Sequence, residues 1–213
     1  TFCCAVLMVG TVGRARAAVE ASLCGTPENI REFLGGPEQA KLVFENRGFL
    51  YFIDFSQSNA QIQKMVNTSG AVAPMISPDG QYVTYATGAP SDGRTSRPST
   101  AWICELKVDG QPIEVAADNG YNPRFLYDAA NPTVLYATCG AHGESGKYAW
   151  EGCGKMMTRE LSGGSLGEPR TVYDGGSYFG GMSYDGRYLA TAEQNANAFI
   201  LDLQNPGDGP ATL

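Results

Sequence analysis

A repeated strand–turn–strand pattern constrains the fold of this 213-residue chain more than any other feature. Residues 73–87 contain Ile-Ser-Pro-Asp-Gly-Gln-Tyr-Val, and residues 180–191 contain Met-Ser-Tyr-Asp-Gly-Arg-Tyr-Leu. An Asp-Gly pair between two short apolar runs predicts a β-hairpin, because both turn residues tolerate a positive φ. A looser copy lies between them, at residues 122–138. Asp79 and Asp185 are 106 residues apart, which is twice 53, so the pattern predicts a repeating unit of that size.

A second repeated feature has the same phase. An acidic residue followed by an apolar one recurs every 42 to 55 residues, at Asp54-Phe55, Glu105-Leu106, Glu160-Leu161 and Asp202-Leu203. The first three pairs are each followed by a polar or glycine-rich turn and a further short strand, predicted at 62–66, 113–116 and 170–173. Four antiparallel strands in this order are typical of one β-propeller blade. An ordinary β-sandwich with coincidental turns is the alternative.

The repeats occupy residues 41–213 and predict an all-β fold, a partial β-propeller of four-stranded antiparallel blades. We expect the end of one blade, two complete blades and most of a fourth, at 41–66, 70–117, 120–174 and from 176 onward. The 27 glycines, 12 prolines and 17% charged residues suit many short strands and turns. Residues 18–40 form an N-terminal segment, in which Thr26-Pro27-Glu28-Asn29 predicts the start of a short helix.

Residues 1–17 form an apolar leader. The run 2–13 is almost entirely apolar but too short to span a bilayer, so no membrane span is predicted. Ala15 and Ala17 fit the small-x-small pattern of a signal-peptidase site. Two interpretations stay open: a signal peptide, or a retained segment packed on the domain or on a neighbouring subunit. An export signal predicts an extracytoplasmic location, whether periplasmic, cell-surface or secreted.

The runs at 76–83 and 182–189 resemble the repeat of TolB-like β-propellers. The Ser-Pro-Asp-Gly form is fairly specific, and the resemblance covers residues 41–213, but the middle copy has Asp-Ala-Ala-Asn-Pro at 128–132 in place of the turn. The resemblance implies a six-bladed propeller in a periplasmic or secreted protein, often one that docks other proteins. About four blades are too few to close such a ring, so we expect further blades or completion by other subunits.

Four of the six cysteines lie outside the leader: Cys24, Cys104, Cys139 and Cys153. Behind an export signal they predict two disulfides. Cys139 ends one predicted strand and Cys153 begins its neighbour, so a disulfide there would close the base of the intervening loop; Cys24 with Cys104 follows by elimination. No cysteine or histidine spacing typical of zinc occurs, and we predict neither a metal site nor a cofactor.

Two long insertions join the second and third strands of their blades, at residues 88–100 and 140–152. In a four-stranded meander these loops share an edge with the loops that enter the first strands, so we expect binding at that face. Tyr148 and Trp150 in the second insertion are candidates for recognising a protein or a carbohydrate, packing over the blade edge being the alternative. The candidates on the channel side, for which buried packing is the alternative, are Tyr121, Asn122, Arg124 and Tyr178.

The sequence predicts a protein that is not an enzyme. His142 is the only histidine, which excludes multi-histidine metal sites and paired acid/base histidines. Residues 163–167 match the G-x-S-x-G nucleophile elbow, but no histidine follows and a strand is predicted instead of a helix, so we interpret them as a hairpin tip. A net charge of −7 without any basic run argues against nucleic-acid binding.

We therefore expect a non-catalytic exported propeller that binds a protein or carbohydrate partner through the inserted-loop face. One alternative is a structural subunit of an extracellular assembly or filament, which would self-associate through its leader and its open propeller edges. Another is the accessory propeller of a larger hydrolase.

Overall fold

The computed structural model describes residues 40–88, 99–117, 120–127, 131–139, 153–174, 177–183, 185–193, 198–205 and 211–212. Every regular element within these residues is a β-strand, and no helix occurs among them. The predicted leader and short helix lie outside the described residues. Cys24, Tyr148 and Trp150 lie outside them as well.

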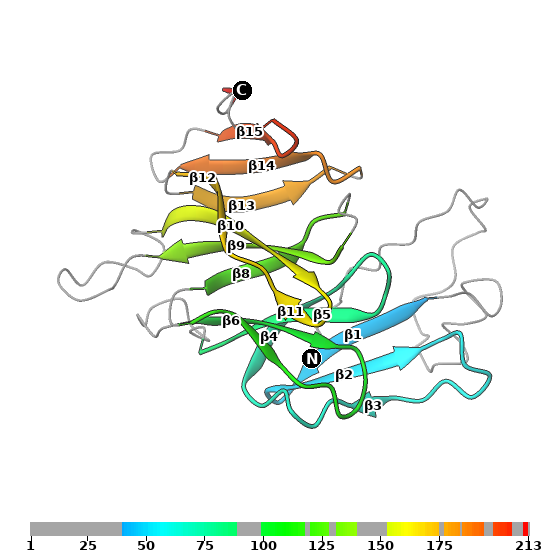
Figure 1. Cartoon of the computed structure of the whole chain (residues 1–213). Coiled ribbons are helices and arrows are strands. Elements are labelled where there is room, and N and C mark those ends of the chain that lie inside the picture. The colour runs from blue at the N-terminus through cyan, green and yellow to red at the C-terminus, as the bar shows by residue number, and fades with distance from the viewer. Residues whose placement is uncertain are drawn as a thin grey trace, which may run out of the picture.

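The strands form four antiparallel sheets that follow one another along the chain, from blue to red in Figure 1. Sheet 1 consists of β1 (Lys41–Asn46), β2 (Phe49–Asp54) and β3 (Gln63–Lys64). Sheet 2 consists of β4 (Ala71–Ile76), β5 (Tyr82–Thr87), β6 (Thr100–Glu105) and β7 (Ile113–Ala116). Sheet 3 consists of β8 (Gly120–Phe125), β9 (Thr133–Cys139), β10 (Cys153–Ser162), β11 (Ser165–Leu166) and β12 (Arg170–Tyr173). Sheet 4 consists of β13 (Ser177–Met182), β14 (Tyr188–Glu193), β15 (Ala198–Asp202) and β16 (Ala211–Thr212).

Sheets 2 and 4 are simple meanders, in which each strand pairs with the next along the chain. Sheet 3 differs because β10 is ten residues long. Its far end pairs with β11, Leu161 opposite Leu166, while its middle pairs with β12, Thr158 opposite Arg170. Gly163 and Gly164 connect β10 to β11 with φ values of 58° and 79°, which confirms the hairpin tip predicted for this stretch.

The Ser-x-Asp-Gly turn is built in the same way in sheets 2 and 4. In sheet 2, Gly80 N–H donates to Ser77 O, Tyr82 N–H donates to Ser77 Oγ, and Ser77 Oγ donates to Asp79. Ser183, Asp185 and their neighbours repeat these bonds. The predicted hairpins are confirmed by the pairing of β4 with β5 and of β13 with β14. The glycines of both turns have positive φ values and the aspartates do not, so only the glycine uses the freedom that both residues have. The aspartate instead accepts hydrogen bonds within the turn.

The acidic–apolar pairs lie at the ends of β2, β6 and β15 and within the last three residues of β10. The apolar residue donates its N–H back to the residue that precedes the neighbouring strand, over 2.8 to 2.9 Å in all four copies. The donors and acceptors are Phe55 to Ala40, Leu106 to Gln81, Leu161 to Pro132 and Leu203 to Arg187. The apolar side chains then enter the core, where Phe55 is fully buried and Leu161 is nearly so.

Successive sheets pack face to face in chain order, which is the arrangement of propeller blades. We call the side of a sheet that faces the next sheet its trailing face and the opposite side its leading face. The trailing face of sheet 1, with Val43 and Phe52, packs on the leading face of sheet 2, with Val83 and Tyr85. Two more such layers follow, between sheets 2 and 3 and between sheets 3 and 4. A single sandwich of two sheets does not give this series.

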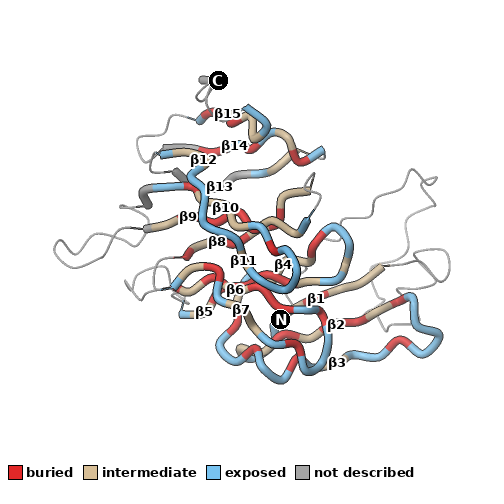
Figure 2. Tube along the Cα trace, in the orientation of Figure 1, coloured by how far each residue is buried: buried red, intermediate tan, exposed pale blue. Residues whose placement is uncertain are grey.

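The middle sheets are covered on both sides, as the buried residues in Figure 2 indicate. The neighbouring residues Val83 and Thr84 point to opposite faces of sheet 2, yet both are fully buried. β5 is therefore buried over the four consecutive residues 83–86, instead of showing the alternation of a half-exposed sheet. The described residues are thus all-β, with propeller-like packing of antiparallel sheets.

Candidate functional site

The strand ends that border the two insertions lie at the same edge of the fold. β5 ends at Thr87 and β6 begins at Thr100, while β9 ends at Cys139 and β10 begins at Cys153. The register brings each pair of ends together, Thr87 opposite Thr100 and Cys139 opposite Cys153. The first strands of sheets 2, 3 and 4 also begin at this edge, which we call the insertion edge. Residues 89–98 and 140–152 lie outside the described residues.

Ser99 joins the base of the first insertion to the next sheet. Its carbonyl accepts a hydrogen bond of 2.8 Å from Gly120 N–H at the start of β8. The adjoining Tyr121 has a raised pKa because the phenol is half-buried, and a hydrogen bond from the Ser99 backbone opposes that shift. The hydroxyl of Ser99 is fully buried and, among the described residues, has no hydrogen-bond partner. Buried hydroxyls without a hydrogen-bond partner are uncommon in proteins.

Two of the predicted channel-side tyrosines occupy equivalent positions. Tyr121 pairs with Ala137 and Tyr178 pairs with Ala192, each as the second residue of its sheet's first strand. Both residues therefore belong to the insertion edge. The structure brings Tyr121 together with the base of the first insertion and places the backbone of Tyr178 at the corresponding point of sheet 4.

Asn122 lies in a β-bulge. The register of β8 shifts between Tyr121 and Arg124, and Asn122 has a φ of 49° with an exposed side chain. Asparagine is among the residues that tolerate this left-handed conformation best. Ala73 has a φ of 52° at the equivalent point of β4, where the register also shifts. The bulge is thus a repeated feature of the first strands, which the sequence pattern did not reveal.

Arg124 lies beyond the bulge, opposite Leu135 and further from the insertion edge than Tyr121. Its guanidinium is half-buried, and this burial lowers its pKa, while the nearby Tyr127 acts in the opposite direction. Arg124 therefore does not join the two tyrosines in one cluster at the edge.

The cysteines fall into two groups. Cys139 and Cys153 are direct partners in the β9–β10 register, as a disulfide across neighbouring strands requires. Cys104 is a buried free thiol that donates to Glu105 O over 3.3 Å, and burial raises its pKa to about 12. Its predicted partner Cys24 lies outside the described residues, so that pairing stays a prediction.

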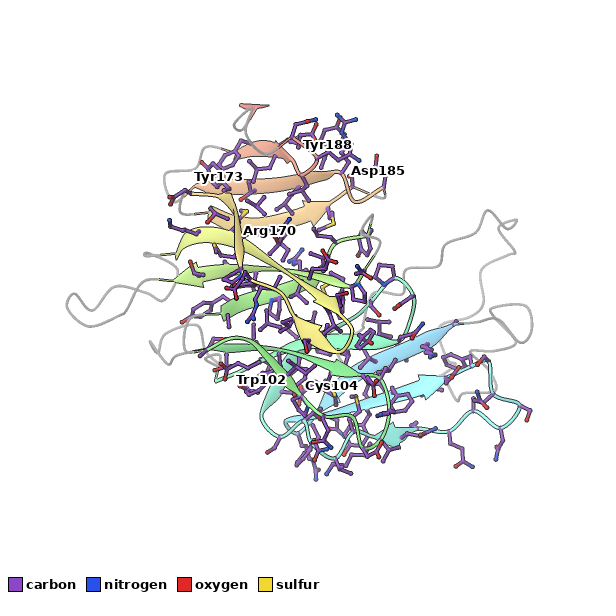
Figure 3. All side chains as sticks on the ribbon, in the orientation of Figure 1. Trp102, Cys104, Arg170, Tyr173, Asp185 and Tyr188 are labelled. Carbon is purple, nitrogen blue, oxygen red and sulfur yellow. The ribbon has the colours of Figure 1, made fainter. Side chains whose placement is uncertain are left out.

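Sequence reasoning missed a groove on sheet 3. It has a volume of about 550 Å³ and lies where β11 and β12 turn back along the far half of β10. The residues that line it carry four hydroxyls, two carboxylates and one guanidinium; they are Thr133, Thr158, Glu160, Ser162, Ser165, Leu166, Gly167, Glu168 and Arg170. Figure 3 labels Arg170 on β12. The length of β10, which creates the groove, has no sequence signal beyond the glycine pair at its tip.

Glu160 illustrates the chemistry of this groove. Its carboxylate accepts a hydrogen bond from Asn131 Nδ2 and remains exposed to solvent. The groove opens at the end of β10 opposite to the insertion edge, so it is separate from the predicted site. The side chains of the groove can donate hydrogen bonds to a polar molecule and accept hydrogen bonds from it.

In the part of the chain that the structure describes, no three His, Cys, Asp or Glu side chains gather in the way that a metal ion needs. None of the elements described there is a helix long and apolar enough to cross a membrane.

Comparisons with known proteins give structural relatives only. No family model matches the chain, and no curated protein matches it. The chain is similar to dihydro-heme d1 dehydrogenase NirN, with a TM-score of 0.50 and 13% identity over 88% of this chain and 35% of that one. It is also similar to a puromycin-hydrolyzing peptidase of Mycobacterium tuberculosis, with a TM-score of 0.49 and 18% identity over 81% and 28% of the two chains.

A third similar structure is the β-propeller domain of the Trilobed protease from Pyrococcus furiosus, with a TM-score of 0.31 and 10% identity over 81% and 66% of the two chains. The chain spans about a third of the length of the first two proteins. At these identities the likeness concerns the fold and not the activity.

Proposed function

We propose that this chain is a TolB-like β-propeller module of an exported, non-catalytic protein, which binds a protein or carbohydrate partner through its insertion edge. The observation that carries the proposal is the contact between Ser99 and Gly120. It ties the base of the first insertion to the first strand of the next sheet, directly beside Tyr121. Loops held on a rigid scaffold in this way commonly carry the binding function of a domain.

One further observation supports the proposal. Cys139 and Cys153 lie in register, so that a disulfide formed in an oxidising compartment would hold the base of the second insertion. Export and a fixed binding loop are therefore consistent with each other.

The proposal is tested by replacing residues 89–98 and 140–152, separately and together, with short Gly-Ser turns. Binding of the intact chain to extracytoplasmic proteins and to a glycan panel is compared with that of the variants. We expect binding to be lost in the double replacement while the β-sheet circular dichroism spectrum stays the same.

The matched control changes the opposite edge, where Gly163-Gly164 is replaced with Asn-Gly, a pair that suits the same turn. This control is expected to bind as the intact chain does. Unchanged binding by the double replacement would overturn the proposal. The accessory-propeller alternative stays a prediction from the family resemblance, and the full-length reading frame tests it.

A further inference from the structure

The groove of sheet 3 lies on the trailing face of that sheet. Alternate residues of a strand share a face, and Met156 of β10 belongs to the buried layer between sheets 3 and 4. Thr158, Glu160 and Ser162 follow at alternate positions and therefore continue the same face beyond that layer. The residues that the register places directly opposite them, and that also line the groove, are Thr133, Ser165 and Arg170.

Sheet 3 departs from the other sheets at one apolar position of this face. The position lies two residues before the acidic residue that marks the end of the third strand. It holds Phe52 in sheet 1, Ile103 in sheet 2 and Ile200 in sheet 4, but Thr158 in sheet 3. Phe52 and Ile103 are buried in the layers between sheets, whereas Thr158 is half-buried. A smaller, polar side chain thus replaces a core residue in this sheet alone.

A second position of the face shows the same departure. The residue that pairs with the acidic residue is Lys41 in sheet 1, Tyr82 in sheet 2 and Tyr188 in sheet 4, but Thr133 in sheet 3. Two long side chains of the repeat are therefore short in sheet 3, and the space that they would fill is part of the groove. Departures from an otherwise consistent pattern are expected at functional sites.

Hydrogen bonds hold the walls of the groove in place. Asn131 Nδ2 donates to Glu160 Oε1 over 2.5 Å, which fixes one carboxylate. Gly167 N–H donates to Glu160 O over 2.8 Å, and Gly167 O accepts a hydrogen bond of 2.8 Å from Arg159 Nε. Arg159 Nη1 also donates to a carbonyl of β7, over 2.8 Å. The turn that carries Glu168 is thus fixed to sheets 2 and 3, and a preorganised site loses less entropy when it binds a ligand.

The lining residues favour a neutral ligand with many hydroxyl groups. The carboxylates of Glu160 and Glu168 accept hydrogen bonds, Arg170 donates them, and the four hydroxyls do both. Since both signs of charge line one groove, a small anion and a small cation each meet a like charge there. Leu166 and the threonine methyl groups offer apolar surface to the C–H groups of a sugar ring. The volume of about 550 Å³ lies within the range of roughly 300–1,000 Å³ that is usual for small-molecule sites.

We propose that the groove of sheet 3 binds a neutral mono- or disaccharide. This site goes beyond the proposed function, because the groove opens at the end of β10 opposite to the insertion edge and shares no residue with it. The fixed carboxylate of Glu160 accepts a hydrogen bond from one sugar hydroxyl, and Arg170 donates to another.

The first test titrates the intact chain with maltose, cellobiose and lactose by isothermal calorimetry. Thr158→Ile introduces the residue that sheets 2 and 4 have at this position, so it suits the fold but fills the groove. It should weaken binding of the sugar about tenfold or more. The matched control is Thr171→Ile, which is exposed, pairs with Met157 on the other face and does not line the groove. Failure of all three sugars to bind at millimolar concentration, or equal losses in the two variants, would overturn the proposal.

The second test changes an exposed residue, so that folding is not at risk. Glu168→Gln should weaken binding of the sugar about threefold or more, because it removes a charged acceptor from the groove. Glu114→Gln is the matched control, since Glu114 is exposed on β7 and does not line the groove. Glucosamine and glucuronic acid should bind more weakly than glucose does. Tighter binding of either charged sugar, or an equal effect of the two glutamate substitutions, contradicts a site for a neutral saccharide.

The variant with both insertions replaced distinguishes this site from the insertion edge. It should bind the sugar as the intact chain does, because residues 89–98 and 140–152 do not line the groove. Loss of sugar binding in that variant would assign the sugar to the insertion edge and overturn the proposal for sheet 3. Retained sugar binding together with unchanged partner binding would overturn the proposed function alone.

Discussion

Arg187 and Asp202 form a two-point ion pair across β14 and β15, with Arg187 Nη2 2.7 Å and Nε 3.2 Å from Asp202 Oδ2. The hydrogen bonds from Arg187 hold the pKa of the Asp202 carboxyl well below its usual range, against the smaller effect of burial. Backbone N–H of Gln204 and the amide of Asn205 add to this lowering. The pair lies beside Tyr188, whose ring contacts the Arg187 guanidinium at 4.9 Å.

Because of this ion pair, we expect part of the free energy of unfolding to be lost at acidic pH. A carboxyl whose pKa is depressed in the folded state stabilises the fold above its unfolded pKa, about 3.9, and this contribution is lost as the pH falls through the folded value. Asp202→Asn should therefore flatten the decline in the free energy of unfolding below about pH 4. Urea midpoints measured from neutral to acidic pH check this.

Asp109→Asn provides the control for the acid series, because Asp109 is an exposed carboxylate in the turn between β6 and β7. Its urea midpoints should follow those of the unaltered chain throughout. If Asp202→Asn declines as steeply as the unaltered chain does, the pair with Arg187 does not contribute the expected dependence.

The two Ser-x-Asp-Gly turns predict unequal effects of the same substitution. Ser77 is 3% exposed, and its hydroxyl accepts the Tyr82 N–H at 2.9 Å. Ser77→Ala leaves that N–H without its acceptor and should lower the free energy of unfolding by about 1–3 kcal/mol. Ser183→Ala removes the same bond at a more exposed site, where water replaces the hydroxyl, and should cost less. Denaturant unfolding compares the two, and equal losses would contradict the role of burial.

The register of Cys139 and Cys153 predicts a disulfide in protein that is purified under oxidising conditions. Mass spectrometry after thiol blocking, with and without prior reduction, should show this pair protected until reduction. Cys139→Ser with Cys153→Ser should then lower stability by about 3 kcal/mol, because the unfolded loop of this length gains conformational freedom. Two thiols that are already blocked without reduction would rule the disulfide out.

The repeat made much of this fold predictable from sequence, for reasons that the hydrogen bonds explain. The Asp-Gly pairs mark turns whose serine and aspartate side chains satisfy backbone groups, and the acidic–apolar pairs mark strand ends such as Leu106, whose N–H reaches Gln81. Both signals are local, so a sequence pattern can carry them. A strand at the position of β10 was also expected, but the length of β10 and the extra strand β11 were not.

Tertiary packing determined the features that sequence could not provide. Ala73 has a positive φ that alanine avoids on its own, and only the bulge in β4 makes it acceptable. The contact of Ser99 with Gly120 depends on how two sheets stack, and no local pattern encodes that distance. Tyr148 and Trp150 stay predictions, since they lie outside the described residues.

Gly120 lies where sheets 2 and 3 approach each other closely. A Cβ at this buried position would lie 2.8 Å from Ala101 Cβ and 2.9 Å from Ala116 Cβ, so Gly120→Ala should lower the free energy of unfolding by about 1–3 kcal/mol through overpacking. Gly181 in β13 is the matched control, because a Cβ there meets no atom within 4 Å and its φ is not in the left-handed region. Gly181→Ala should change the stability little. Thermal and denaturant unfolding measure both variants, and a Gly120→Ala protein as stable as the control would mean that the two sheets can separate to admit a methyl group.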